Sequence, residues 1–370
     1  MSSTLAFALT FTAGIVATLI LISFSKYIFK LIPSRYRPSS DPKDDHYQIL
    51  VLGDIGRSPR MQYHALSVVR SGAHVDLVGY KEWLRWQMSL FIGLPLKALW
   101  QSYDLFYTLA YTAPAAKWII IQMYKFYECF FARRVPDVSV TVTEAMARDM
   151  RRAPFGLKMP ILTLHDRPAA TFQPMTSREE RKKFLLGLRE TKDHAERIIT
   201  GKTRLVISST SWTPDEDFGI LLEGLGPQKA DFEKMMRDLK AGGHLPNVDI
   251  LTAWLSTRDY ATLLAAADLG VCLHRSSSGV DLPMKIVDMF GAGLPVTAYS
   301  AYESFSELVK EGENGCGFET PDDLSVILRR LLSSSSTELE KLRQGAVREG
   351  SRRWDDEWDP VIGRTLGLVA

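Results

Sequence analysis

The stretch Asp268-Leu-Gly-Val-Cys-Leu-His-Arg-Ser-Ser-Ser-Gly-Val-Asp-Leu-Pro-Met-Lys-Ile-Val-Asp288 contains the clearest structural pattern in the 370-residue chain. Its apolar run, Leu269–Leu273, has the length and composition of a buried strand. A polar loop with a glycine follows, and a helical pattern begins at Leu282. This order predicts one unit of a mostly parallel α/β sheet, in which ligands bind beyond the carboxyl ends of the strands.

The same alternation of strand and helix patterns continues on both sides of this stretch. The segment 177–203 is charged and has helical propensity, and the patterns that follow predict strands at Thr203–Thr210, Val248–Leu251 and Leu294–Ala298, with a helix at Arg258–Ala267. We therefore predict a C-terminal Rossmann-like domain over residues 200–345 and a C-terminal helical segment over residues 346–370.

A second α/β unit lies nearer the N-terminus. His46–Gly53 is typical of a parallel strand, Met61–Ser71 of a helix and Ala73–Gly79 of the next strand. Glycines in the loop that joins the first strand to the helix either turn the chain tightly or let a ligand approach closely, and both interpretations remain open. With further strands at Val138–Thr143 and Ile161–Leu164, the pattern predicts an N-terminal Rossmann-like domain over residues 43–168.

An uncharged apolar run, Thr4–Ser25, precedes both predicted domains. It is long enough to cross the ~30 Å hydrocarbon core of a bilayer as a helix. Basic residues follow it and none precedes it, so the positive-inside rule places the rest of the chain in the cytosol. We predict a single-pass anchor over residues 1–32; the alternative, a cleaved signal peptide, fits less well because a basic region before the apolar run is missing.

Composition narrows the function classes. The chain is 46% hydrophobic and its formal net charge is +2, with no basic stripe interleaved with aromatic residues beyond the first forty positions. These features exclude a disordered chain and argue against nucleic acid as a partner. Cys129, Cys272 and Cys316 are too few and too scattered for a disulfide framework or a zinc site, and Cys272 is expected to be an inert core thiol.

The loop between the predicted strand and helix has the chemistry of an anion site. Ser276, Ser277, Ser278 and Gly279 bring small side chains and backbone amides to a helix N-terminus, which favours a diphosphate, and Lys285 is a nearby counter-charge. Asp288 lies two turns into the helix, where its carboxylate can accept hydrogen bonds from ribose hydroxyls. The alternative is an ordinary capped helix with a solvated loop. A divalent metal is not required, because no Asp-x-Asp pair follows a strand, and no cofactor is implied.

Three runs carry a resemblance to a known family: Gly53–Ala65, Ser208–Phe218 and Ala267–Gly291. They resemble the chitobiosyldiphosphodolichol β-mannosyltransferase family, which adds the first mannose during assembly of the lipid-linked oligosaccharide. The resemblance implies a GT-B fold, with two Rossmann-like domains facing a cleft: a shortened N-terminal domain that binds the acceptor and a C-terminal domain that binds the GDP-sugar. It also implies GDP-mannose as the donor and dolichyl diphosphate chitobiose as the acceptor of a β-1,4 linkage, at the cytosolic face of the endoplasmic reticulum membrane. Other glycosyltransferases of the same pathway are the further partners that it suggests.

The resemblance also assigns site residues. The donor-binding set that it implies is Gly53, Gly56, Arg57, Thr210, Ser211, Trp212, Ser276, Ser277, Ser278, Gly279, Asp281, Leu282, Pro283, Met284, Lys285 and Asp288. Because the family inverts the sugar carbon, a base must remove the proton of the acceptor hydroxyl, and the candidates are Asp54, Glu144 and His165. Each also has a structural explanation: Asp54 as a partner of loop amides, Glu144 as a helix cap and His165 as a linker side chain.

The chain departs from the family pattern at two junctions. Ile121–Gln122 runs directly into Met123, and Leu222–Gln228 is shortened, with Leu225 where the family has lysine. The interpretation that follows is an enzyme with internal segments missing. Two alternatives stay open: a catalytically impaired isoform or paralogue that acts as a membrane-bound binding partner, and a GT-B enzyme that uses another nucleotide sugar.

Overall fold

The computed structural model describes residues 39–54, 58–80, 137–209, 247–276, 278–333 and 337–369, together with Cys129, Ala132, Arg133 and Gly242. The predicted anchor over residues 1–32 and both junctions that depart from the family pattern lie outside these residues. Within the ranges given, no helix combines the length and the apolar character needed to cross a membrane.

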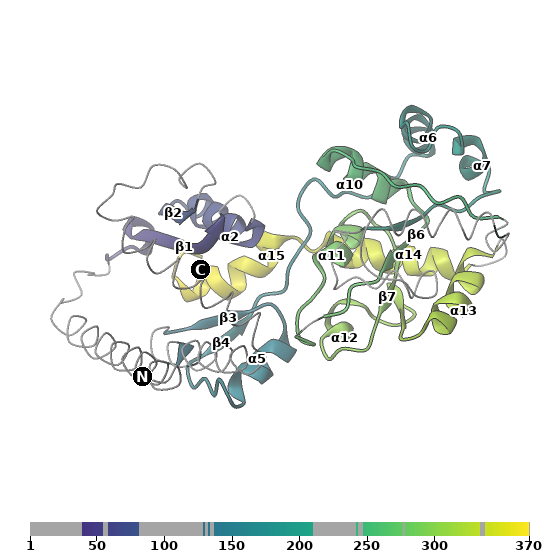
Figure 1. Ribbon diagram of the computed structural model, residues 1–370. Coiled ribbons are helices and arrows are strands. Elements are labelled where there is room, and N and C mark those ends of the chain that lie inside the picture. The colour runs from purple at the N-terminus through teal and green to yellow at the C-terminus, as the bar shows by residue number, and fades with distance from the viewer. Residues whose placement is uncertain are drawn as a thin grey trace, which may run out of the picture.

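The N-terminal lobe consists of residues 39–80 and 137–163, and is joined by residues 354–369 from the end of the chain (Figure 1). It contains two parallel strand pairs, β1 with β2 and β3 with β4, and a helix follows the first strand of each pair. The elements are η1 (Pro42–Asp44), β1 (His46–Asp54), α2 (Pro59–Arg70), β2 (His74–Tyr80), β3 (Ser139–Thr141), α5 (Glu144–Arg151) and β4 (Ile161–Thr163). The predicted strand–helix–strand unit near the N-terminus is confirmed.

In the described residues of the C-terminal lobe, within 178–351, the sheet has four strands in the order β5-β6-β7-β8. Every pairing in it is parallel, as the alternation of strand and helix patterns predicted. Its strands are β5 (Val206–Ser208), β6 (Leu269–Cys272), β7 (Val296–Tyr299) and β8 (Gly315–Phe318). Its helices are α6 (Arg178–Gly187), α7 (Ala195–Ile199), α10 (Thr257–Ala266), α11 (Met284–Gly291), α12 (Phe305–Leu308), α13 (Pro321–Leu332) and α14 (Glu338–Ser351).

One predicted strand is wrong. Val248–Leu251 belongs to neither a strand nor a helix. In the described sheet β5 pairs only with β6, and Val248–Leu251 does not pair with the other edge of β5. Val248 and Leu251 are also 47% and 55% exposed, which shows that the apolar run does not enter the core. Its residue types favoured a strand, but tertiary pairing decides whether a strand forms.

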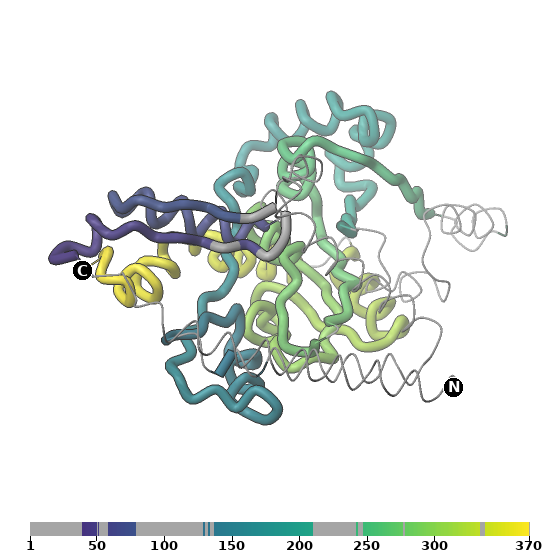
Figure 2. The backbone as a smooth tube through the Cα atoms, turned by 60° about the vertical axis from the view of Figure 1, so that its left-hand side comes forward, coloured from purple at the N-terminus to yellow at the C-terminus, as the bar shows by residue number. Residues whose placement is uncertain are grey.

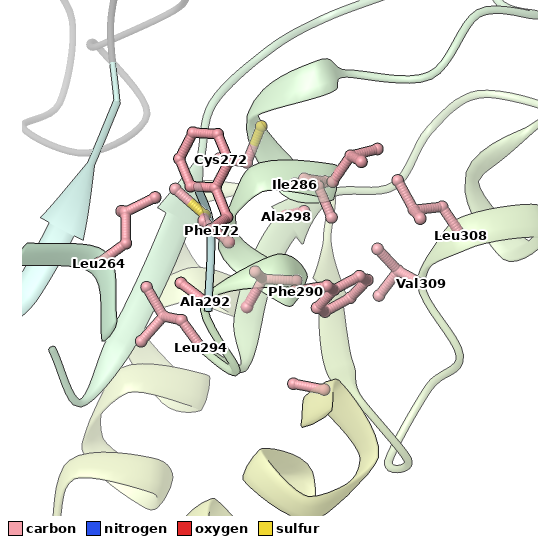
Figure 3. Packing of buried hydrophobic residues seen from close by; sticks show 14 of the residues in the cluster. Phe172, Leu264, Cys272, Ile286, Phe290, Ala292, Leu294, Ala298, Leu308 and Val309 are labelled. Carbon is pink, nitrogen blue, oxygen red and sulfur yellow. The ribbon is translucent and has the colours of Figure 1, made fainter. Parts of the chain in front are cut away.

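The core of the C-terminal lobe surrounds α11. Ile286, Met289 and Phe290 are at most 1% exposed and contact β6, β7 and the end of α14 through one apolar cluster (Figure 3). Every residue of β6 is buried, as expected for a strand of a parallel sheet that is covered on both faces. Cys272 lies in this cluster, and burial raises the pKa of its thiol to about 11. The predicted inert core thiol fits this environment.

The end of the chain leaves the C-terminal lobe and packs on the N-terminal lobe. After α14, the helix α15 (Trp354–Trp358) and the π-helical turn η4 (Asp359–Gly363) lie against α2, so the segment 59–70 and the C-terminal segment 354–363 are side by side (Figures 1 and 2). Trp354 Nε1 donates to Ser67 Oγ at 3.0 Å, and Trp358 Nε1 donates to His64 Nδ1 at 3.0 Å. The predicted segment 346–370 is thus largely helical. Its first part, the end of α14, packs on the C-terminal lobe, whereas α15 and η4 pack on the N-terminal lobe.

Gly350 allows α14 to approach α11, and its replacement tests this packing. A β-carbon at Gly350 would stand 1.8 Å from the carbonyl oxygen of Phe290, so Gly350→Ala is expected to lower the free energy of unfolding by about 3 kcal/mol or more. The matched control is Gly187→Ala, in α6, where no atom stands within 4 Å of the new β-carbon and the better helix propensity of alanine gains up to ~1 kcal/mol. Urea denaturation of both variants measures the two effects. Equal stabilities would contradict the close packing of α14 on α11.

His64 is expected to make stability depend on pH. Burial, followed by the positive charge of Arg60, lowers the pKa of His64 to about 4, whereas a histidine in the unfolded chain has a pKa near ~6.5. The unfolded chain therefore binds the proton first, and the free energy of unfolding should fall as the pH drops from about 6.5 towards 4, by at most about 3 kcal/mol.

The control for this prediction is His64→Asn, whose amide oxygen still accepts from Trp358. Burial raises the pKa of Asp288 to about 7, so the folded chain binds this proton first and Asp288 raises the free energy of unfolding as the pH falls. This effect opposes that of His64. The test is therefore the difference in the free energy of unfolding between His64→Asn and the wild type at each pH. Denaturation curves at pH 7, 6 and 5 measure this difference. Identical pH trends in the two proteins would show that His64 is not the group that titrates.

Candidate active site

The polar residues of the candidate site gather where strands of both lobes end. Glu144 and His165 follow β3 and β4 in the N-terminal lobe, and the loop 273–283 follows β6 in the C-terminal lobe. Ligands of parallel α/β proteins bind beyond the carboxyl ends of the strands. The end of β3 is joined to this loop by the hydrogen bond between Thr143 and Val280, and His165 is joined to the start of α5 through Glu307.

The loop after β6 is folded around Asp281. Ser276 and Ser278 donate their hydroxyl hydrogens to the Asp281 carboxylate, and His274 Nε2 lies 3.7 Å from Asp281 Oδ2. Burial alone would raise the pKa of Asp281, but the two serine hydrogen bonds, a backbone amide and the charge of His274 together hold it below its usual value. Asp281 is therefore an anion at neutral pH.

The serines of this loop also bind its backbone. Gly279 N donates to Ser276 Oγ at 2.7 Å, and Val280 N donates to Ser278 Oγ at 3.3 Å. Gly279 has a φ of 74°, in the left-handed region that glycine adopts without strain. The amides predicted to face an anion are thus already bonded to hydroxyl groups, and a phosphate at this loop would compete with Ser276 and Ser278 for them.

Contacts from outside hold the loop in place. The Thr143 hydroxyl donates to the carbonyl oxygen of Val280, which links the N-terminal lobe directly to the loop. From the segment after β7, Ser304 Oγ donates to the carbonyl oxygen of Asp281 at 2.6 Å, and Glu303 N donates to that of Gly279 at 3.0 Å. The loop is consequently fixed to both lobes.

The helix α11 starts at Met284, two residues later than predicted, because the N-cap residue Pro283 has an extended backbone and Leu282 before it is buried outside the helix. Met284 is 36% exposed, and Lys285 is half-buried and has a partner. The residues of the predicted diphosphate site therefore lie around the start of this helix. Whether they bind the donor stays a prediction.

Asp288, on α11, is a desolvated carboxyl group close to two tyrosines. Burial raises its pKa to about 7, and within the described residues its side chain makes no hydrogen bond. Burial is the main reason that the pKa of Tyr63 on α2 is raised, and the charge of Asp288 raises it further. Burial also raises the pKa of Tyr260 on α10 to about 12, again with a contribution from the charge of Asp288. A carboxyl group in this setting is a candidate for ligand binding or proton transfer.

Of the three candidate bases, the structure brings Glu144 and His165 together through a residue that the sequence did not indicate. Glu307 on α12 accepts hydrogen bonds from the backbone amides of Glu144 at 2.7 Å and Ala145 at 2.8 Å. Its Oε2 also lies 3.0 Å from His165 Nε2. The N-cap of α5 is Thr143, which accepts from Met146 N at 2.9 Å, so the capping role considered for Glu144 belongs to its neighbour. No sequence signal could have found Glu307, because it lies 142 residues from His165 on a four-residue helix.

Several predicted site residues cannot be placed. Gly53 and Asp54 end β1, but only their backbone is described. The residues that lie outside the described ranges are Gly56, Arg57, Thr210, Ser211, Trp212 and Ser277. Among the residues that the structure does describe, no group of three or more His, Cys, Asp or Glu side chains is arranged to hold a metal ion.

The two residues after His165 form buried ion pairs that the sequence did not predict. Arg60 on α2 binds the Asp166 carboxylate with two hydrogen bonds of 2.8 and 2.5 Å, and the Asp166 side chain is 2% exposed. Arg167, 4% exposed, donates to Glu349 on α14 at 2.7 Å and to Glu357 on α15 at 2.8 Å. The linker between the lobes is therefore attached to helices of both lobes.

Comparison with known proteins agrees with this architecture. Residues 205–334 match the family model described as glycosyl transferases group 1. Two solved structures share the fold: a glycosyltransferase from Rickettsia africae (TM-score 0.57, 12% identity, 88% of this chain and 96% of that one) and Anabaena Alr3699/HepE in complex with UDP (TM-score 0.53, 15% identity, 87% and 100%). At these identities the likeness establishes the GT-B glycosyltransferase fold and nothing finer.

Sequence relatives extend the comparison. An Arthroderma benhamiae protein named chitobiosyldiphosphodolichol beta-mannosyltransferase is 48% identical over 252 residues, which are 62% of this chain and 56% of that protein. A Yarrowia lipolytica protein of the same name is 33% identical over 85% of each chain. The Arabidopsis thaliana protein named UDP-glycosyltransferase TURAN is 29% identical over 87% of this chain and 98% of its own length.

The last two alignments run over 404 and 465 positions, more than the 370 residues of this chain. The relatives therefore contain segments, within the aligned span, that this chain lacks. This difference in length agrees with the missing internal segments inferred from the sequence. Since the Yarrowia relative is matched over most of both lengths, the chain belongs to the chitobiosyldiphosphodolichol beta-mannosyltransferase family.

Proposed function

We propose that the chain transfers mannose from GDP-mannose to dolichyl-diphosphate-linked chitobiose with formation of a β-1,4 linkage. The observation that carries this proposal is the family membership, together with a loop of serines and glycine at the start of α11 where both lobes meet. In an inverting transfer the acceptor hydroxyl attacks the sugar carbon on the face opposite GDP. The new C–O bond forms as the bond to the diphosphate breaks, and a base takes the hydroxyl proton.

The proposed donor site uses the residues around α11. Ser276–Lys285 would surround the diphosphate, whose charge the helix N-terminus and Lys285 stabilise without a metal ion. Thr210, Ser211 and Trp212 would line the cleft, opposite Gly53, Gly56 and Arg57. Asp288 would accept hydrogen bonds from the ribose. The predicted anchor over residues 1–32 would hold the enzyme at the cytosolic face of the endoplasmic reticulum membrane, where its lipid acceptor lies.

A second candidate function is transfer from a UDP-sugar. The name of the Arabidopsis relative and the UDP in the Anabaena structure favour it, and a site that surrounds a diphosphate does not distinguish guanine from uracil. The segments that the chain lacks relative to its relatives favour the third interpretation, an impaired isoform that still binds a nucleotide.

Mannose transfer is the direct test of the proposal. We expect detergent-solubilised protein to transfer radiolabelled mannose from GDP-mannose to a chitobiosyl diphosphate phytanyl acceptor, with at least about 100-fold less transfer by the Lys285→Ala, Asp288→Ala double variant. Transfer from a UDP-sugar in place of GDP-mannose would support the second candidate. Folded protein that binds GDP without any transfer would support the impaired isoform.

The affinity for GDP is expected to depend on the ionisation of Asp288. Because burial raises the pKa of Asp288 to about 7, its carboxylate, the stronger acceptor for ribose hydroxyls, becomes the main form only above that pH. Between pH 6 and pH 8 the GDP affinity should rise about tenfold more in the wild type than in Asp288→Asn. Isothermal titration calorimetry measures both proteins, and parallel pH dependences would remove Asp288 from the nucleotide site.

A further inference from the structure

We propose that His165 is the base of the transfer and that Glu307 is its positioning residue. This inference rests on the proposed function and identifies one residue among the three candidates that the sequence left open. The observation behind it is the contact of 3.0 Å between His165 Nε2 and Glu307 Oε2, two side chains that follow the carboxyl ends of strands in different lobes.

Glu307 is built into its position by three contacts. Its Oε1 accepts from Ala145 N, and its Oε2 accepts from Glu144 N, so the carboxylate is fixed at the N-terminus of α5. Its side chain is 15% exposed and that of His165 is 26% exposed. The carboxylate is therefore largely shielded, whereas the imidazole keeps an accessible part.

The charge of Glu307 fixes the tautomer of His165. Burial would raise the pKa of Glu307, but the hydrogen bonds from His165 and from the amides of Glu144 and Ala145 outweigh it and lower the pKa. An ionised carboxylate only accepts hydrogen bonds, so the hydrogen of the neutral imidazole lies on Nε2. Nδ1 then carries the lone pair, and it bonds to no group in the described ranges.

The pair lies next to the proposed donor loop. Thr143, which precedes the α5 amides bound by Glu307, donates to Val280, and Ser304, one turn before Glu307, donates to Asp281. In the transfer, the acceptor O–H bond breaks and its proton goes to His165 Nδ1. The oxygen forms the bond to the mannose carbon, and the electrons of the broken C–O bond leave with GDP. Glu307 stabilises the resulting imidazolium.

Two observations separate His165 from its neighbours. Glu144 is exposed in the first turn of α5, where water solvates its carboxylate. The nearby Arg148 and Glu303 bind each other at 2.7 Å, and both are about half exposed. Glu303 therefore offers a matched control, an acid on the same segment that does not contact His165.

The experiment compares mannose transfer by wild type, His165→Ala, Glu307→Gln, Glu303→Gln and the double variant His165→Ala, Glu307→Gln. We expect kcat to fall at least about 100-fold in His165→Ala and about tenfold in Glu307→Gln, with KM for GDP-mannose unchanged, and Glu303→Gln to match the wild type. Added imidazole should restore part of kcat in His165→Ala. The double variant should be no worse than His165→Ala, because residues that act as a unit are not additive.

Several results would overturn the inference. If imidazole does not restore kcat in His165→Ala, His165 is not the base. If the losses of kcat in the two single variants multiply in the double variant, or if Glu307→Gln is as active as Glu303→Gln, Glu307 is not its positioning residue. Unchanged GDP affinity shows that each variant is folded. If Glu307→Gln weakens α5, the imidazole rescue is still informative, because it is measured in His165→Ala, which keeps Glu307. An inactive wild type overturns the proposed function itself, while an active wild type with neutral variants overturns only this inference.

Discussion

The arrangement of the two lobes depends on the polar contacts of three consecutive linker residues, which are one histidine–carboxylate hydrogen bond and two sets of buried ion pairs. His165 binds Glu307 on α12, Asp166 binds Arg60 on α2, and Arg167 binds Glu349 and Glu357 on the last helices of the chain. Asp166 and Arg167 are almost fully buried, so the loss of one partner would leave a charge without compensation inside the protein, which is far more costly than the net gain from forming the pair. The linker is therefore constrained in position although it has no regular secondary structure.

This constraint connects the fold to the chemistry. The first of these three linker residues, His165, is also the one that follows β4 towards the other lobe, and the carboxylate of Glu307 that it contacts accepts hydrogen bonds from the first amides of α5. The loop after β6, proposed to bind the donor, is attached to the same region through Thr143 and Ser304. The residues that hold the lobes together and the proposed base are thus neighbours, so a shift of one lobe would change the geometry of the proposed site.

The return of the chain to its starting lobe has a similar role. Two tryptophans of α15 fill the space beside α2, and each indole N–H has a buried or half-buried partner there. Because Arg167 binds Glu357 of the same helix, the linker, the N-terminal lobe and the last helix stabilise one another. The core around α11 instead depends on apolar packing and close backbone approach, as at Gly350.

The local pattern of the sequence determined the elements of this protein. Alternating strand and helix signals give the parallel order around β6 and α11, and the long runs of family residues, such as Ala267–Gly291, give the fold and the family. The same local signals failed at Val248–Leu251, where suitable residue types found no place in the sheet. Only the tertiary structure decided which polar residues meet, namely Glu307 with His165, Arg60 with Asp166, and Trp358 with His64. The physical reason is range: hydrophobic periodicity acts between residues a few positions apart, whereas these contacts join side chains more than 100 positions apart, and the packing of whole elements sets them.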